Sequence, residues 1–229
     1  MVCKKSVDLT LNERRIRSFV LRQGRLTPGQ EKALEEVWPE FGCQLSDGVQ
    51  NFAERFGNNN PVHLEVGFGM GDSLATQAAE NPQFNYLGVE VHRPGVGHLL
   101  MLLRENSLHN VRVFSEDSIE VLNQCIPDGS LARVQIFFPD PWPKKRHHKR
   151  RIIQADFVSL LKKKLVSGGM IHFATDWVPY AEDVETLFSH LEGFSPAEAP
   201  PRPETKFERR GLKLGHEIRD LAYLSVDEQ

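Results

Sequence analysis

The chain has 229 residues, of which 40% are hydrophobic and 26% are charged, and its formal net charge at pH 7 is −3. This is an ordinary globular composition, and no apolar run approaches the ~20 residues of a transmembrane helix, which excludes an integral membrane protein. Residues 1–12 are polar and lack the apolar segment of a secretory signal, and the three cysteines have no zinc-site spacing. We therefore expect a cytoplasmic protein without a metal and without a membrane partner.

The charge is distributed unevenly along the chain. Residues 144–151 read KKRHHKRR and hold six of the 28 Lys and Arg residues, so the rest of the chain has 22 basic residues against 31 acidic ones. The first 30 residues add seven Lys and Arg against two acids. Basic patches on an acidic protein indicate an anionic partner such as nucleic acid, although a solvated surface run gives the same pattern.

We expect two regions, a basic arm with a helix in residues 1–60 and an α/β domain in residues 61–229. Residues 1–26 are polar and weakly periodic, which favours an arm that is mobile or folds on binding. Thr27, Pro28 and Gln30 match a capping box with proline at the first helical position, and Pro39 is expected to end that helix. The sequence GNNNP at residues 57–61 marks the break before the domain.

Strand and helix patterns alternate from residue 62 onward. We expect strands at residues 63–66, 86–91, 111–115, 132–138 and 170–174, and helices at residues 72–80, 94–106, 119–125, 152–165 and 179–191. Gly168 and Gly169 are expected to cap the fourth of these helices, residues 196–203 to form a Pro-rich loop, and residues 207–224 to supply a closing pair of strands. Repeated βα units predict a mostly parallel, doubly wound sheet, which binds ligands at the carboxyl ends of its strands.

The motif EVGFGMG at residues 65–71 follows the first of these strands. Its glycines permit a tight turn and a close approach of a ligand to the backbone. The spacing differs from the GxGxxG fingerprint of dinucleotide-binding proteins. Glu65 would repel a pyrophosphate and suits a cationic ligand such as S-adenosylmethionine, although a purely structural glycine turn remains an alternative.

Acidic residues also end the next two strands. Glu90 is placed to accept hydrogen bonds from both ribose hydroxyls, as carboxylates do in dinucleotide folds. Asp117 is expected near an adenine amino group. Each acid alone could be a solvated strand end, but three acids at three successive strand ends favour a nucleoside pocket.

The motif FFPDPWPK at residues 137–144 ends the fourth strand. Prolines on both sides of Asp140 fix the backbone, which suits a carboxylate held rigidly over a reactive centre. The basic run follows at once and places phosphate-binding charge beside that carboxylate. ATDW at residues 174–177 and TKFE at residues 205–208 are expected on the same rim, if they are not structural.

In this order, EVGFGMG, GVEVHRPGVG, FFPDPWPKKRHHKRR, ATDW and TKFE resemble the bacterial tRNA (guanine-N7)-methyltransferase family over residues 60–225. The resemblance implies a Rossmann-like class I methyltransferase, as a monomer or homodimer, with a seven-stranded, mostly parallel sheet. It also implies transfer of a methyl group from S-adenosylmethionine to N7 of the guanosine at position 46 in the variable loop of tRNA.

The resemblance also assigns roles to individual residues. For the cofactor it implies Glu65, Gly67, Gly69, Glu90, Asp117 and Asp140, with Asp140 also catalytic. For the substrate it implies Lys144, Asp176, Thr205, Lys206, Phe207 and Glu208. For RNA contact it implies Arg146, His147, His148, Lys149, Arg150 and Arg151. No metal ligand is expected.

Three alternatives remain at this point. A nucleotide-dependent oxidoreductase is disfavoured by the glycine spacing and by Glu65. A non-catalytic RNA-binding module on the same fold is disfavoured by the intact set of acids. A methyltransferase acting on another RNA or another atom is the third alternative.

Overall fold

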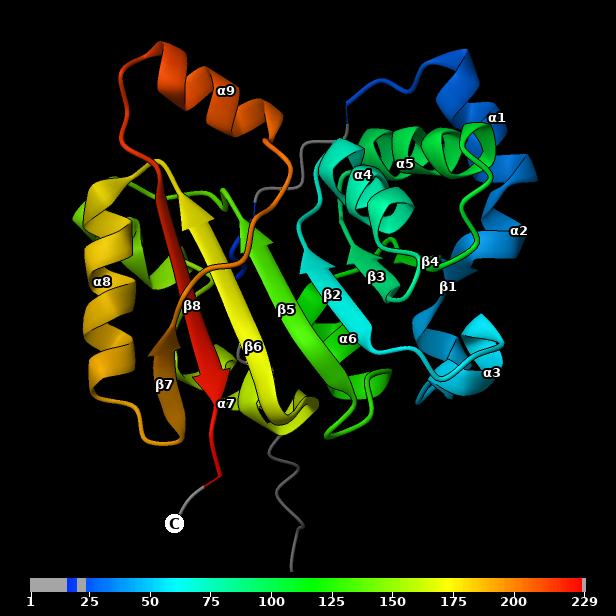
Figure 1. Cartoon of the computed structure of the whole chain (residues 1–229). Helices are drawn as coiled ribbons and strands as arrows, with labels where there is room; N and C mark the ends of the chain where they lie inside the picture. The colour runs from blue at the N-terminus through cyan, green and yellow to red at the C-terminus, as the bar shows by residue number, and fades with distance from the viewer. Residues whose placement is uncertain (1–15, 20–23, 228–229) are drawn as a thin grey trace, which may run out of the picture.

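The computed structural model describes residues 16–19 and 24–227, and its centre is an eight-stranded sheet in the order β1-β4-β3-β2-β5-β6-β8-β7 (Figure 1). The strands are β1 (Gly42–Cys43), β2 (Val62–Val66), β3 (Asn85–Val89), β4 (Val111–Phe114), β5 (Leu131–Phe137), β6 (Leu165–Thr175), β7 (Phe194–Ala197) and β8 (Arg219–Ser225). Neighbouring strands are parallel except at β8, which is antiparallel to both β6 and β7. The mostly parallel sheet is thus confirmed, with the two-residue edge strand β1 added to the seven strands that were expected.

Helices cover both faces of this sheet. They are α1 (Pro28–Glu36), α2 (Trp38–Phe41), α3 (Phe52–Phe56), α4 (Asp72–Glu80), α5 (Arg93–Glu105), α6 (Ser118–Gln124), α7 (Ala155–Lys164), α8 (Val178–Ser189) and α9 (Lys206–Lys213), with 3₁₀ turns η1 (Leu45–Asp47) and η2 (Lys145–Arg150). Successive strand residues point to opposite faces, so Val113 belongs to the core cluster under α1, α4 and α5, and Phe114 to the cluster under α6, α7 and α8. None of the helices in the described part of the chain is long and apolar enough to span a bilayer.

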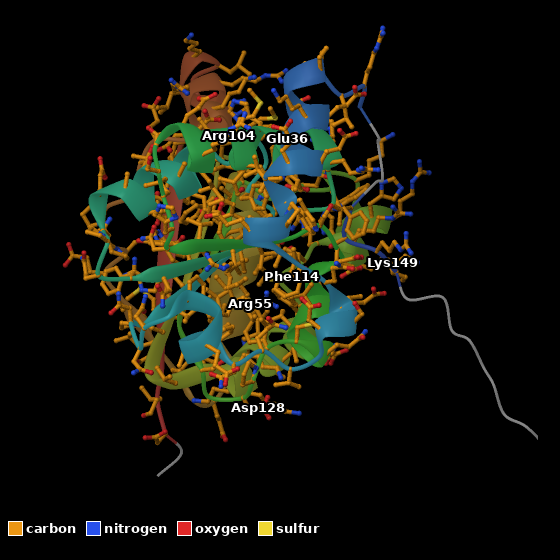
Figure 2. The ribbon with its side chains drawn as sticks, turned by 90° about the vertical axis from the view of Figure 1, so that its right-hand side faces the viewer. Glu36, Arg55, Arg104, Phe114, Asp128 and Lys149 are labelled. Carbon is orange, nitrogen blue, oxygen red and sulfur yellow. The ribbon has the colours of Figure 1, made fainter. Side chains whose placement is uncertain are left out.

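The region before the domain is folded onto it from α1 onward. The capping box at Thr27 is confirmed: Gln30 N donates to Thr27 Oγ1 at 3.3 Å, and Thr27 N donates to Gln30 Oε1 at 2.9 Å. Helix α1 packs on α5, where Arg104 and Glu36 form an ion pair of 3.4 Å (Figure 2). The predictions for residues 1–15 and 20–23 lie outside the described residues, and the boundary near residue 60 stays a prediction.

Two local predictions are wrong. Pro39 does not end the first helix but lies in the first turn of α2, where a missing N–H is tolerated. Gly168 and Gly169 do not cap α7, because α7 ends at Lys164 and β6 begins at the next residue. The pairing of β6 with β5 shifts register between Leu165 and Met170, and Gly168 supplies a φ of 74° at that irregularity.

The closing pair of strands is also misplaced in the prediction. Residues 206–213 form α9, and the pair consists of β7 and β8. A proline in an edge strand is tolerated, so Pro196 does not prevent β7. The TKFE sequence begins a helix because it is itself a capping box. Figure 1 shows α9 lying beyond the carboxyl ends of β5 and β6.

Candidate active site

A cleft of about 440 Å³ opens at the carboxyl ends of β2, β3, β4 and β5. Its volume is within the range of small-molecule sites. Among the described residues that line it, three are carboxylates (Glu90, Glu116 and Asp140) and none is Lys or Arg. This lining favours a ligand that carries positive charge and disfavours a pyrophosphate. No group of three metal-ligating side chains occurs within the residues that the structure describes.

The glycine loop between β2 and α4 forms the floor of the cleft. Gly67 and Gly69 line it with φ values of 74° and 60°, in the left-handed region that side chains disfavour. Gly71 has a φ of 83°, and a Cβ there would lie 2.7 Å from Leu99 Cβ. The glycines are therefore required by the turn and by its packing on α5.

Glu90 joins the end of β3 to this loop. Its Oε2 accepts a hydrogen bond from Gly69 N at 2.9 Å, and its Oε1 accepts from Val91 N at 2.7 Å and His92 N at 2.9 Å. A carboxylate offers about four acceptor positions, so these bonds leave about one for a ligand. Glu90 thus fixes the loop as well as facing the cleft, and in this geometry it has room for one ribose hydroxyl rather than two.

Glu65 lies behind the glycine loop and not among the residues that line the cleft. It is 3% exposed, and its carboxyl accepts a hydrogen bond from Gln77 Nε2 at 3.2 Å. Gln77 Oε1 in turn accepts from Gln135 Nε2 at 2.7 Å. Burial raises the pKa of Glu65 to about 8, although the bond from Gln77 opposes this rise. Glu65 is therefore mostly protonated at neutral pH in this structure.

The end of β4 places a different acid in the cleft from the one predicted. Asp117 is the N-cap of α6, and its Oδ1 accepts from Ile119 N at 2.9 Å. Its neighbours Glu116 and Ser118 line the cleft. Glu116 was missed by the sequence reasoning, although the pair of adjacent acids after this strand was a signal for it.

The segment after β5 brings Asp140 into the cleft through strained backbone. Phe138 and Trp142 have φ values of 51° and 46°, which are unusual for residues other than glycine. Such conformations cost free energy and concentrate at functional sites. Trp142 Nε1 also donates to Ser18 O at 3.1 Å, so a short N-terminal segment that lines the cleft is tied to this loop.

The basic run forms the turn η2 directly after this segment. Lys144, Arg146 and Lys149 are exposed, and Lys149 lies at the periphery in Figure 2. Arg150 stacks its guanidinium 4.9 Å from the ring centroid of Trp142. His147 meets the same ring edge-on, with 5.8 Å between centroids, and His148 is half-buried.

Arg151 differs from the rest of the basic run. It is 3% exposed, donates from Nε to Pro141 O at 2.8 Å, and forms an ion pair with Asp183. Its guanidinium also lies 4.6 Å from the ring centroid of Tyr180. In this structure Arg151 holds the loop in place and does not face solvent, although it was one of the residues expected to contact RNA.

The residues expected to bind substrate on α9 have divided tasks. Thr205 and Glu208 form the capping box of the helix, with bonds of 3.1 and 3.2 Å. Phe207 is 59% exposed and lines the cleft, and Lys206 is exposed. Asp176, at the end of β6, lies 2.9 Å from Nδ1 of His216, beyond the end of α9. The structure thus gathers these residues on one rim, but only Phe207 among them lines the cleft.

Comparison with known proteins identifies the family of this chain. A family model described as "Putative methyltransferase" matches residues 59–221. A tRNA (guanine-N(7)-)-methyltransferase of Alkalilimnicola ehrlichii is 53% identical, over 96% of this chain and 97% of its own. One from Escherichia coli is 52% identical, over 93% and 92%. The chain belongs to the tRNA (guanine-N(7)-)-methyltransferase family. The resemblance seen in the motifs is confirmed.

Solved structures of lower similarity confirm the fold of this family member. The 16S rRNA methyltransferase KamB superposes with a TM-score of 0.57 at 13% identity, covering 77% of this chain and 93% of its own. The antibiotic-resistance methyltransferase Kmr gives a TM-score of 0.54 at 13% identity, over 82% and 95%. The fold is therefore that of the Rossmann-like class I methyltransferases.

Proposed function

We propose that this protein transfers a methyl group from S-adenosylmethionine to N7 of the guanosine at position 46 in the variable loop of tRNA, in the cytoplasm. The observation that carries the proposal is the continuous segment 137–151, which joins an acidic cleft to an exposed basic loop. Relatives that carry this activity in their names match more than 90% of the chain at about half identity, which supports tRNA and guanine N7. Position 46 rests on the resemblance alone.

The cleft suits the methyl donor in size and charge. When bound, S-adenosylmethionine supplies an electrophilic methyl group on a sulfonium. Gly67 and Gly69 would approach it through the backbone, and the remaining acceptor position of Glu90 would receive a ribose hydroxyl. The carboxylates of the lining favour its positive charges, whereas a dinucleotide would place its phosphates among them. This disfavours an oxidoreductase.

Methyl transfer to guanine N7 does not require the protein to remove a proton first. N7 has an in-plane lone pair and no proton at neutral pH, so attack needs no general base. The described lining of the cleft accordingly contains neither Lys nor Cys. The protein must align the reactants and stabilise the positive charge that develops on the purine. We assign the second task to Asp140, which the prolines on either side hold in the cleft.

The basic loop would bind the phosphates of the tRNA beside this carboxylate. Lys144, Lys145, Arg146 and Lys149 are exposed and have no acidic neighbour in the run. Contacts to phosphates give affinity that falls with salt and carries no sequence information. The loop therefore positions the RNA, and the choice of guanine is left to the cleft and to the rim formed by α9.

The decisive experiment is a methylation assay on unmodified tRNA with nucleoside analysis of the product. We expect 7-methylguanosine at one variable-loop position. A tRNA with 7-deazaguanosine at that position keeps its Watson–Crick edge but has carbon in place of N7, and it should bind without accepting a methyl group. Methylation of the substituted tRNA at a normal rate would refute the choice of atom. Binding of the unmodified tRNA without any methyl transfer would instead support a non-catalytic RNA-binding module.

A further inference from the structure

Arg202 lies at the centre of an ionic network beside the cleft. It belongs to the segment 198–205, which crosses in front of β8 and β6 in Figure 1 before α9 begins. Prolines 200, 201 and 203 restrict the backbone around it. Its side chain is only 6% exposed, which is unusual for arginine and requires paired partners.

The guanidinium of Arg202 binds two carboxylates at once. Its Nε and one terminal nitrogen donate to the two oxygens of Asp220 at 2.8 and 2.7 Å, which is the bidentate geometry that arginine favours. The other terminal nitrogen donates to Glu208 Oε2 at 2.5 Å. Glu208 is the N3 residue of the capping box of α9, so this bond fixes the first turn of the helix that carries Phe207.

The same guanidinium also touches the loop that carries Asp140. Its central carbon lies 5.1 Å from the ring centroid of Phe137 and 5.3 Å from that of Phe138, within the range of cation–π contact. Phe138 is one of the two strained residues of that loop. Arg202 therefore contacts the start of α9 and the start of the Asp140 loop simultaneously.

The network is anchored in the sheet. Asp220 on β8 lies 2.8 Å from Nε2 of His172 on β6, a residue with no exposed surface. Burial alone would raise the pKa of Asp220, but the bonds from His172 and Arg202 outweigh it and lower the pKa to about 2. Asp220 therefore stays ionised at neutral pH and holds the guanidinium against the sheet.

We propose that Arg202 is a positioning residue that sets α9, with Phe207, at a fixed place relative to Asp140. This inference rests on the proposed function, because the two parts that it joins are the two sides of the proposed guanine site. Only a planar fork meets Asp220, Glu208 and the two rings together. A lysine would bring one point charge to one of these partners.

The test compares four single variants and one double variant in single-turnover methylation of unmodified tRNA, with both substrates saturating. Arg202→Met removes the charge and keeps the apolar stem, and Arg202→Lys keeps the charge without the fork. Glu208→Gln keeps an oxygen for Thr205 N but loses the anionic partner of Arg202. Arg55→Met is the control, because Arg55 forms an ion pair of 2.9 Å with Asp47 on a different part of the molecule (Figure 2).

We expect Arg202→Met to lower the single-turnover rate about 100-fold, since a displacement of about 1 Å at a reacting centre has an effect of that order. The rate of Arg202→Lys should be less than tenfold above that of Arg202→Met. Glu208→Gln should lower the rate about tenfold relative to the parent. The effect of the double variant Arg202→Met/Glu208→Gln should not exceed that of Arg202→Met alone, since both act through one contact. The affinity of the Arg202 and Glu208 variants for S-adenosylmethionine, measured by calorimetry, should stay within threefold of the parent. The methylation rate of Arg55→Met should also stay within threefold of the parent.

The melting temperature of each variant shows whether it is folded under the assay conditions. A loss of rate in a folded variant is due to positioning and not to loss of stability. Folded Arg202→Met with a rate within threefold of the parent overturns the inference, and so does recovery of the parent rate by Arg202→Lys. If Arg202→Met does not fold, Glu208→Gln and Arg202→Lys decide by the same thresholds. A parent protein that forms no 7-methylguanosine overturns the proposed function and this inference with it, whereas an active parent with unaffected variants overturns the inference alone.

Discussion

At the ends of β3 and β4 the acids are held by backbone N–H groups, whereas at β6 and β8 they are held by side chains. Glu90 accepts three backbone bonds, two of them from the two residues that follow it, and Asp117 accepts one from Ile119. Asp176 is paired with His216, 40 positions away, and Asp220 with His172, 48 positions away. One half of the rim is thus fixed by backbone donors and the other by side chains of distant segments.

This difference fits the two tasks that we assign to the rim. A site that binds the same small molecule in every turnover gains from rigid backbone donors, whose position depends little on any one side chain. A site that receives a large RNA is built from several distant segments of the chain, such as α9 and the segment before it. The comparison predicts that single substitutions in the first half alter cofactor affinity, and that those in the second half alter the rate.

Asp140, on the loop after β5 that Arg202 contacts, gives the largest expected effect and tests the prediction on the rate. Asp140→Asn keeps the shape of the side chain and removes the charge that we expect to stabilise the methylated purine. Loss of one preorganised charge-stabilising group lowers rates by about 10²–10³-fold. Single-turnover assays should show this loss while tRNA binding, measured by filter retention, is retained. A rate within a few-fold of the parent would mean that Asp140 is not central.

Glu90 gives the next effect and tests the first half. Glu90→Gln places an NH₂ group against backbone N–H donors that now meet carboxylate oxygens, so both the loop and the ligand contact are weakened. Loss of a charge-assisted hydrogen bond costs about 1.5–3 kcal/mol, equivalent to roughly 10–150-fold in affinity. Calorimetry with S-adenosylmethionine should show it.

The exposed Glu80, at the end of α4, offers a matched control for that measurement. Glu80→Gln removes the same charge from the same protein without touching the cleft, so its affinity should equal that of the parent. Equal affinity in Glu90→Gln as well would remove Glu90 from the cofactor site and would weaken the contrast between the two halves of the rim.

The same division explains what the sequence could and could not predict. Helix 72–80 and the acid Glu90 at the end of β3 follow from local patterns in the sequence, and both were predicted. The burial of Glu65 depends on Gln77 and Gln135, which come from another helix and another strand. Arg202 lies in a Pro-rich segment whose composition predicts a surface loop. Its contact with Asp220 is seen only in the folded chain.

Glu65 supplies a smaller effect, on folding, that checks its place behind the loop. Its pKa is about 8 in the folded protein, against 4.5 for a solvated glutamate of the unfolded chain. Between these pH values the folded chain binds one more proton than the unfolded chain, so the free energy of unfolding falls as pH rises, by at most about 1.4 kcal/mol per pH unit. The stabilisation is complete below about pH 4.5 and is lost as pH rises through 8.

Urea unfolding of the parent and of Glu65→Gln from pH 5 to 8 measures this contribution. Gln has no proton to bind and keeps an acceptor for Gln77, so its stability should fall less with pH than that of the parent. The difference between the two should grow in favour of Glu65→Gln toward pH 8. Parallel curves would show that Glu65 is solvated and ionised throughout, as a residue facing the cleft would be.

The smallest expected effects lie in the basic loop, where they separate residues that face RNA from the one that holds the loop. Arg146→Glu/Lys149→Glu reverses two exposed charges, and each lost phosphate contact should reduce the slope of log affinity against log salt by roughly 0.7–0.9. The melting temperature should not change, because neither side chain is buried.

Arg151→Met should do the opposite, lowering the melting temperature through the lost bonds to Pro141 and Asp183 and leaving the salt slope unchanged. Filter binding of tRNA at several salt concentrations, together with thermal unfolding of both variants, distinguishes the two kinds of residue. A salt slope that falls in Arg151→Met by as much as one phosphate contact would mean that the buried guanidinium turns outward when RNA binds, and the basic run would then act as a single surface.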